Sequence, residues 1–372
     1  MKIGVLGLGQ AGGKIAQALY QQDNNLYIPL AVNLAKQDLE SLSLQEHNKL
    51  HVRWKVQGAG RDTQVPYQAL KDDDNQTAFL SKISDVFGLN MDDQDDYTFK
   101  VDYLLIAVGA GGGTGNGFLR AILDSGMTTI LPPIGVVLAT PREIDSFEEQ
   151  KNTAELINVL NENLDDESIK SVFLINNDLY ARHVESNWMD SANQHFSKKL
   201  TAFIHQTAQP SQKSVDEADL MKMLTRFGGY SSIETKIGTP VTVLDKIING
   251  LQSNGFSVKT AKSIAVMTVG SQVEQSENII MSTIRTQLPN TSEYVYTGFY
   301  KDPNLTDPEH TENYVMFAGM GMPDYLIAMV ERLKDFKQKQ TISSGQKTLD
   351  LSFLKTNSNE PKQKTKKEFK LW

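Results

Sequence analysis

Hydrophobic residues in the first half of the chain form short continuous runs that are separated by amphipathic segments. The runs Lys2–Leu8, Tyr27–Val32 and Val101–Val108 are apolar at nearly every position, which is typical of strands buried on both faces of a sheet. Between the first two runs, Gly12–Gln22 places its apolar residues at helical spacing. This alternation predicts an α/β fold in which helices pack on both sides of a parallel sheet.

The same two patterns continue through the rest of the first half. Ser146, followed three residues later by Glu149, matches a capping box and marks the start of a long helix. The other expected elements are strand His51–Val56, helix Thr77–Phe87, helix Asn116–Ser125, strand Pro133–Leu138 and strand Ser171–Ile175.

The second half has fewer strand-like runs, and we expect two of its strands to pair antiparallel. Its expected elements are helix Asn187–His205, helix Asp216–Arg226, helix 240–253, strand Lys262–Val269, helix Val273–Thr286, strand Glu293–Tyr300, strand Tyr314–Ala318 and helix Pro323–Lys339. The chain therefore divides into a first domain (1–186), a central helix (187–208), a smaller α+β domain (209–322), a C-terminal helix (323–340) and a flexible basic tail (341–372). The tail is polar and aperiodic, so we expect it to be largely disordered.

Composition narrows the class of protein. The chain has 372 residues, of which 40% are hydrophobic and 22% charged, as in ordinary globular proteins. Its lack of cysteine excludes disulfides, thiolate metal sites and a cysteine nucleophile. No segment reaches the roughly 18 apolar residues of a membrane span, so we expect a cytoplasmic protein without a membrane partner. Net charge is −8, yet residues 331–372 contain 11 basic and 5 acidic residues, which indicates an acidic body with a basic extension.

A glycine run follows the apolar strand that ends at Val108. Five of the seven residues from Gly111 to Gly117 are glycine, and a helix-like segment begins directly afterwards. Backbone N–H groups at such a strand-to-helix junction bind phosphate, and glycine lets the main chain approach it closely. Thr114 is expected to cap the helix with its hydroxyl. A flexible linker fits poorly, because a strand and a helix flank the run.

A second glycine loop, Gly7–Gly12, matches G-x-G-x-x-G between a strand and a helix. By itself this loop suggests a dinucleotide site, and a nicotinamide-dependent oxidoreductase is the alternative function. Such a site usually has an acidic residue at the end of the second strand, where this chain has Asn33. A dinucleotide site also leaves the run at 111–117 unexplained. Two glycine loops on adjacent parallel strands favour a phosphate site with two walls.

The run at 111–117 resembles the GGGTGSG signature of the tubulin/FtsZ superfamily, with Asn116 where that family has Ser or Thr. No lysine follows, unlike in Walker-type loops. The resemblance extends over residues 1–330 and implies a Rossmann-like GTP-binding domain, a long central helix and a smaller α+β domain. It implies GTP or GDP and Mg²⁺ as cofactors.

The resemblance also assigns nucleotide-binding residues, loop by loop. Asn33 could equally be a strand-end turn residue. Asn177 could be a helix cap, although the family match favours a contact with the base. Asn193 lies within an expected helix, where Asn is disfavoured, so a functional position fits it better than a plain solvent position. The residues implied to bind nucleotide are Gly9, Gln10, Ala11, Gly12, Asn33, Gly58, Ala59, Gly60, Gly111, Gly112, Gly113, Thr114, Gly115, Asn116, Thr140, Pro141, Glu143, Asn177 and Asn193. No protein ligand for the metal is assigned.

Two carboxylates three residues apart, Asp216 and Asp219, stand at the start of an expected helix. On spacing alone they read as partners of the helix dipole. The segment also resembles the superfamily's Asn-x-Asp-x-x-Asp synergy loop, with Ser214 in place of Asn. That likeness implies that Asp216 and Asp219 are catalytic and complete the nucleotide site of the next subunit in a filament.

Within the superfamily the chain looks most like the TubZ-type partition GTPases of plasmids and phages. A division-type, FtsZ-like GTPase is the alternative, although the short division-partner peptide is missing from the tail. Six lysines lie between 355 and 370, and Phe369, Leu371 and Trp372 follow or interleave with them. A solubilising tail is the plain interpretation. The likeness implies instead that the tail binds a DNA-binding adaptor, which links the self-assembled filament indirectly to DNA.

Overall fold

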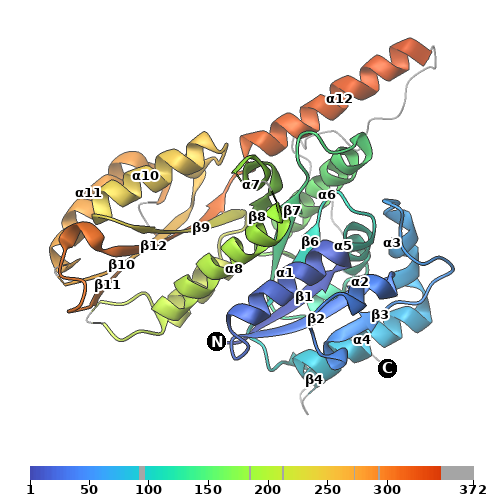
Figure 1. The fold of residues 1–372 in the computed structure, drawn as a ribbon, viewed down its shortest axis with the longest axis horizontal. Coiled ribbons are helices and arrows are strands. Elements are labelled where there is room, and N and C mark those ends of the chain that lie inside the picture. Colours follow the sequence, from blue (N-terminus) through green and yellow to red (C-terminus); the bar gives the residue numbers. More distant parts are fainter. Residues whose placement is uncertain (92–96, 184–185, 212, 272, 292–293, 345–372) are drawn as a thin grey trace.

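The computed structural model describes residues 1–91, 97–183, 186–211, 213–271, 273–291 and 294–344. A single ten-stranded sheet runs through this part of the chain in the order β11-β10-β12-β9-β8-β7-β6-β1-β2-β3 (Figure 1). Its strands are β1 (Ile3–Leu8), β2 (Tyr27–Asn33), β3 (Lys49–His51), β6 (Tyr103–Gly109), β7 (Ile134–Thr140), β8 (Ser171–Asn176), β9 (Tyr230–Ile237), β10 (Ser263–Gly270), β11 (Val295–Lys301) and β12 (Glu312–Met320). A separate two-stranded ribbon pairs β4 (Asn90–Met91) with β5 (Tyr97–Thr98).

Strand direction divides the sheet into two parts. Every neighbouring pair from β3 to β9 is parallel, as the alternating pattern predicts. Beyond β9, β12 runs antiparallel to both β9 and β10, while β11 is parallel to β10. The two parts meet through two residue pairs between β8 and β9, Val172 with Tyr230 and Phe173 with Ser231. The α/β class and the antiparallel pairing in the second half are confirmed.

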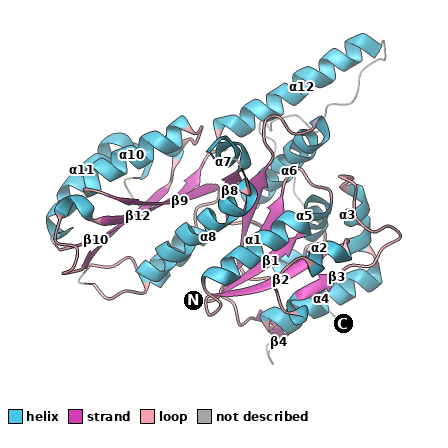
Figure 2. Ribbon diagram, viewed as in Figure 1, coloured by secondary structure: helices cyan, strands magenta, loops and turns pink. Residues whose placement is uncertain are grey.

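Helices cover both faces of the sheet (Figure 2). They are α1 (Gly9–Gln22), α2 (Lys36–Glu40), α3 (Gln64–Lys71), α4 (Asp73–Phe87), α5 (Thr114–Asp124), α6 (Phe147–Asp165), α7 (Asn177–His183), α8 (Trp188–Thr207), α9 (Glu217–Thr225), α10 (Pro240–Ser253), α11 (Glu277–Gln287) and α12 (Asp324–Ser344). Successive strand residues point to opposite faces, so Val5 belongs to a buried cluster that includes residues of α1, α8 and α9, whereas Leu6 belongs to one that includes residues of α4, α5 and α6. This is why the buried strands are apolar at every position.

Helix α1 lies unusually close to β6. A Cβ atom added to Gly12 would lie 2.1 Å from the carbonyl oxygen of Ala107, and one added to Gly7 would lie 2.5 Å from the carbonyl oxygen of Gly12. No side chain fits at such distances. The glycines of the first loop are therefore required for helix–sheet packing, which brings the start of α1 to the carboxyl edge of the sheet.

Helix α12 docks by one face and then leaves the body of the protein. Val330 and Leu333 form a small buried cluster with Ala154 of α6. The distal end of α12 projects beyond α6 in Figure 1. No helix in the described part of the chain is both long and apolar enough to cross a membrane.

Several local expectations differ from the structure. The capping box at Ser146 is confirmed, with Ser146 and Glu149 bonded reciprocally. Thr114 does not cap α5, because Gly113 is already helical and Thr114 becomes the first helical residue. The strand expected at His51–Val56 is wrong beyond His51, since the chain turns there into a loop, and neither α3 nor β9 was predicted. Residues 341–344, which were expected to begin the tail, are the last residues of α12, and the rest of the expected tail lies outside the described residues.

Because α1 lies so close to the sheet, a substitution at Gly12 tests how the two pack. Gly12→Ala places a methyl group against the backbone of Ala107, and we expect it to destabilise the protein by about 1–3 kcal/mol. Gly250→Ala in α10 is the matched control, since no atom lies within 4 Å of the added Cβ, and it should stabilise by about 0.5–1 kcal/mol. Urea unfolding of both variants checks this. Equal midpoints would contradict the packing argument.

Candidate functional site

A cavity of about 790 Å³ opens at the carboxyl ends of β1, β6 and β7. Carboxyl ends of parallel strands are where α/β sheets bind ligands, because the loops that leave the strands converge there. Its wall includes many of the residues expected to bind nucleotide, namely Gly9, Gln10, Ala11, Gly58, Ala59, Gly60, Gly111, Gly112, Gly113, Thr114, Gly115, Pro141 and Asn177. The structure thus brings five separate segments of the chain to one site.

Two helices begin at this cavity. Helix α1 starts at Gly9 and α5 at Thr114, and neither first turn has a side-chain cap. Gly9 has a φ of 71°, and a Cβ atom added there would lie 2.8 Å from the backbone nitrogen of Gly115. The two helix starts therefore touch. Two positive helix ends with uncapped N–H groups make this edge of the sheet suitable for an anion.

Most glycines of the second loop are explained by packing within the protein. An added Cβ atom would lie 2.9 Å from Glu149 Cβ at Gly111, 2.7 Å from Ala59 Cβ at Gly113 and 2.5 Å from the Leu8 carbonyl oxygen at Gly115. Gly112 is different. It is exposed to the cavity, and an added Cβ would have only the Gly109 carbonyl oxygen nearby, at 3.8 Å.

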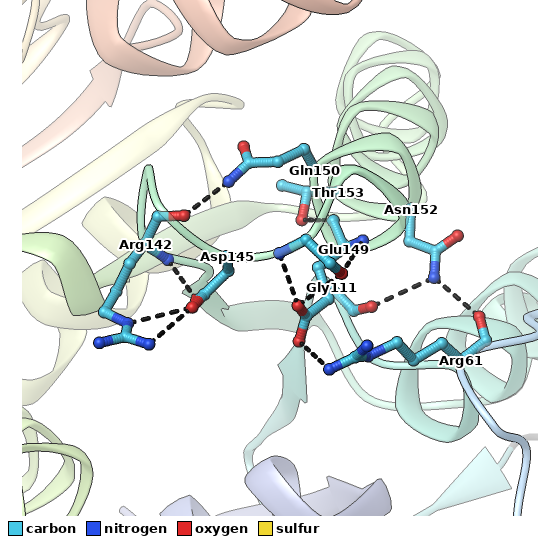
Figure 3. A network of polar contacts seen from close by, with 9 residues as sticks. Arg61, Gly111, Arg142, Asp145, Glu149, Gln150, Asn152 and Thr153 are labelled. Carbon is cyan, nitrogen blue, oxygen red and sulfur yellow. Dashed lines mark hydrogen bonds and ion pairs between the residues drawn. The ribbon is translucent and has the colours of Figure 1, made fainter.

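Buried amides hold the loops from beneath (Figure 3). Asn152 donates from Nδ2 to the carbonyl oxygens of Arg61 at 2.8 Å and Gly111 at 3.1 Å, which joins the loop at 58–61 to the glycine run. Asn116, which is fully buried, donates from Nδ2 to the carbonyl oxygens of Ala110 and Asn152, both at 2.9 Å. Asn116 therefore lies below the glycine loop and does not line the cavity.

Two ion pairs lie in and beside the loop between β7 and α6. The carboxylate of Asp145 accepts from the Arg142 backbone N–H at 2.8 Å and from its guanidinium at 2.8 and 3.1 Å. That guanidinium also lies 5.2 Å from the ring centre of Trp188, at the start of α8. On the other side of the loop, Arg61 pairs with Glu149 at 3.3 Å (Figure 3).

Other expected residues lie away from the cavity wall. Asn33 is buried, where Oδ1 accepts from the Ala35 N–H and Nδ2 donates to Asp38, both at 3.0 Å. Thr140 and Asn193 are buried, and Gly12 packs on β6. Glu143 is exposed and forms an ion pair with Arg332 of α12. Asn33 therefore contributes indirectly, because it positions Asp38 in the wall.

Several charged and aromatic wall residues escaped the sequence analysis. Arg61, Arg142, Asp145, Trp188 and Asp38 all line the cavity. Each is close in sequence to an expected residue, Arg61 to Gly60 and Arg142 to Pro141 for example. Charge next to a phosphate-binding loop is therefore the signal that could have identified Arg61 and Arg142.

Asp216 and Asp219 lie near the amino end of β1, whereas the cavity lies at its carboxyl end. Asp216 caps α9, with Oδ1 accepting from the Asp219 N–H at 2.9 Å. The next residue, Glu217, pairs at 2.7 Å with the amino group of Met1, just before β1 begins, whereas β1 ends at the cavity. Helix α8, which starts at the cavity with Trp188, is 20 residues or about 30 Å long before the chain reaches this segment.

Comparisons with known proteins agree with this geometry. No protein-family model matches the chain. Tubulin-like protein TubZ of Bacillus thuringiensis subsp. israelensis is 26% identical, covering 91% of this chain and 77% of that protein. A crystal structure of a GTPγS-form protofilament of TubZ from Bacillus thuringiensis serovar israelensis matches with a TM-score of 0.75 at 22% identity, covering 93% and 95% of the two chains. The structure of a type III plasmid segregation TubZ has a TM-score of 0.69 at 20% identity, covering 91% and 93%.

Proposed function

Because this chain belongs to the tubulin/FtsZ superfamily and is most like its TubZ-type members, we propose that it is a GTPase that polymerises into filaments and segregates plasmid or phage DNA. The observation that carries the nucleotide-binding part is Gly112. No contact with the described residues requires glycine at this position. The absence of a side chain leaves the backbone of Gly112 open to the cavity, where two helices start. Close approach of a phosphate supplies the explanation.

GTP and GDP are the proposed ligands of the cavity. The glycine run and the start of α1 are proposed to bind the polyphosphate through backbone N–H groups. Pro141 and Asn177, which also line the cavity, are proposed to contact the ribose and base. Thr140, Glu143 and Asn193, which do not line the cavity, are proposed to support these contacts through the β7–α6 loop and α8.

Mg²⁺ is proposed to accompany the nucleotide. No group of three or more His, Asp or Glu side chains within the described ranges could hold a metal by itself. Asp38 brings one carboxylate to the cavity wall, whereas the carboxylate of Glu149 is already paired with Arg61 and Ser146. This donor set fits Mg²⁺ bound mainly by phosphate oxygens and water, with at most about two protein carboxylates. When bound, the ion would neutralise charge on the polyphosphate.

Hydrolysis is proposed to occur between two copies of the chain. Helix α8, which is about 30 Å long, separates Asp216 and Asp219 from the cavity of their own chain. The two carboxylates would therefore act on the nucleotide of a neighbouring subunit. The cavity rim carries exposed apolar side chains, Ile144 at 79% and Met189 at 50% exposure, which a second copy would cover. In head-to-tail contact, the two carboxylates would orient water toward the terminal phosphate. A single subunit would then hydrolyse GTP slowly.

The link to DNA is proposed to pass through the tail. Residues 355–372 follow α12, which projects from the body of the protein (Figure 1). Their lysines would attract an acidic surface in a salt-dependent manner, while Phe369, Leu371 and Trp372 would provide apolar anchors. A DNA-binding adaptor is the proposed partner, and DNA is bound only indirectly.

Replacing Gly112 tests the nucleotide site. We expect Gly112→Val to fold normally and to lose at least about 100-fold in GTP affinity, or about 2.7 kcal/mol, because the side chain would occupy the approach to the phosphate. Calorimetry measures the affinity, and thermal unfolding verifies the fold. Protection of the wild-type protein against heat by NAD rather than GTP, or unchanged GTP affinity in the folded variant, contradicts the proposal.

Replacing Asp216 tests hydrolysis between subunits. Asp216→Asn keeps a side chain that caps α9 yet removes the charge. We expect GTP binding and filaments to persist while phosphate release falls by about 100-fold or more. Adding Gly112→Val protein, which cannot bind GTP but has Asp216, should restore phosphate release in mixed filaments. Wild-type turnover by Asp216→Asn, or turnover independent of protein concentration, contradicts catalysis in trans.

Removing residues 355–372 tests the adaptor proposal. The truncated protein should hydrolyse GTP and form filaments as the full chain does, because the proposed assembly surfaces lie in the body. It should fail to carry an adaptor–DNA complex into the pellet with filaments. Electron microscopy and co-sedimentation provide the measurements. If the truncated protein cannot assemble, the tail is an assembly element and the adaptor role is wrong.

A further inference from the structure

The charge of the cavity wall is a problem for a polyphosphate site. Arg61 and Arg142 line the wall together with three acids, Asp38, Asp145 and Glu149. The two oxygens of Asp145 together accept three hydrogen bonds from Arg142, so the charges of these two residues cancel within their own loop. The remaining wall charges are two carboxylates and the guanidinium of Arg61. An anion bound at the glycine loop would therefore meet uncompensated negative charge.

Glu149 cannot turn away from the glycine loop without cost. Its Oε2 accepts from the Ser146 backbone N–H at 3.0 Å and from the Ser146 hydroxyl at 2.8 Å, which caps α6. Its Cβ is also the atom that a side chain at Gly111 would strike. The carboxylate is thus fixed beside the proposed phosphate site, and only Oε1 is left for another partner.

Arg61 is held by its backbone but not by its side chain. Its carbonyl oxygen accepts from Asn152 at 2.8 Å, and its φ of 70° directs the loop over Gly113. The guanidinium contacts Glu149 Oε1 at 3.3 Å, and the Arg61 side chain is 51% exposed, whereas the Glu149 side chain is 23% exposed. A guanidinium has five N–H donors, so Arg61 can pair with Glu149 and still donate to a phosphate oxygen.

We propose that Arg61 and Glu149 form an opposed charge pair that sets how tightly the cavity holds a nucleotide polyphosphate. Glu149 weakens binding through its fixed negative charge. Arg61 strengthens binding, because it neutralises Glu149 and donates directly to the phosphates (Figure 3). This assignment rests on the proposed binding of GTP at the glycine loop. The Arg61 side chain is thereby a ligand-binding group and Glu149 a tuning residue.

A double-mutant cycle tests the pair, with GTPγS affinity measured by calorimetry. Arg61→Ala should weaken binding by about tenfold or more, which corresponds to about 1.4 kcal/mol. Glu149→Gln should tighten binding severalfold, and Gln can preserve the capping box. In the Glu149→Gln background, Arg61→Ala should cost clearly less than in the wild type. Arg61→Lys should retain most of the affinity, because it keeps the charge.

Controls separate this inference from the function on which it rests. Thermal unfolding of Glu149→Gln should match that of the wild type, so that affinity changes are not caused by loss of the α6 cap. If wild-type protein binds no GTPγS, the proposed function is wrong. If it binds GTPγS but the two substitutions leave affinity unchanged, or their effects add without coupling, the charge pair is wrong and the nucleotide site stands.

Discussion

Backbone contact between the β1–α1 and β6–α5 junctions is the constraint on which the cavity depends. Gly9 touches the backbone of Gly115, and Gly115 in turn touches the carbonyl oxygen of Leu8. Any side chain at these points would push the two helix starts apart. With glycine, both uncapped N-termini face one space, and the positive ends of their dipoles meet there. Backbone packing and the proposed anion binding thus both require glycine at positions 9 and 115.

Around this rigid floor, the walls are held by two different kinds of contact. The buried amides of Asn116 and Asn152 fix the backbone of two loops and of α6 through hydrogen bonds that are shielded from water. The charged groups above them, Arg61 and Glu149, are partly exposed and paired at longer range. Buried bonds keep their geometry, whereas exposed ion pairs are weak and readily rearranged. The site therefore combines fixed backbone donors with adjustable charge.

Distance within the subunit shapes the proposed chemistry. Helix α8 starts at the cavity and packs against α9. Asp216, at the start of α9, is accordingly remote from the wall that its own chain provides. The small two-pair junction of β8 and β9 joins the parallel and mixed parts of the sheet. A site completed by a second copy ties turnover to assembly without any moving part inside the subunit.

The sequence by itself determined those features that depend on neighbouring residues. Continuous apolar runs predicted the parallel strands, the glycine run predicted the junction between β6 and α5, and Ser146 with Glu149 predicted the start of α6. Strand β9 was not predictable, because its YSSIETKI sequence is half polar and pairs with β12, about 80 residues away. A contact between distant segments likewise directed Glu143 to Arg332, away from the cavity. Local patterns encode propensity and spacing, whereas only tertiary packing decides which polar groups face each other.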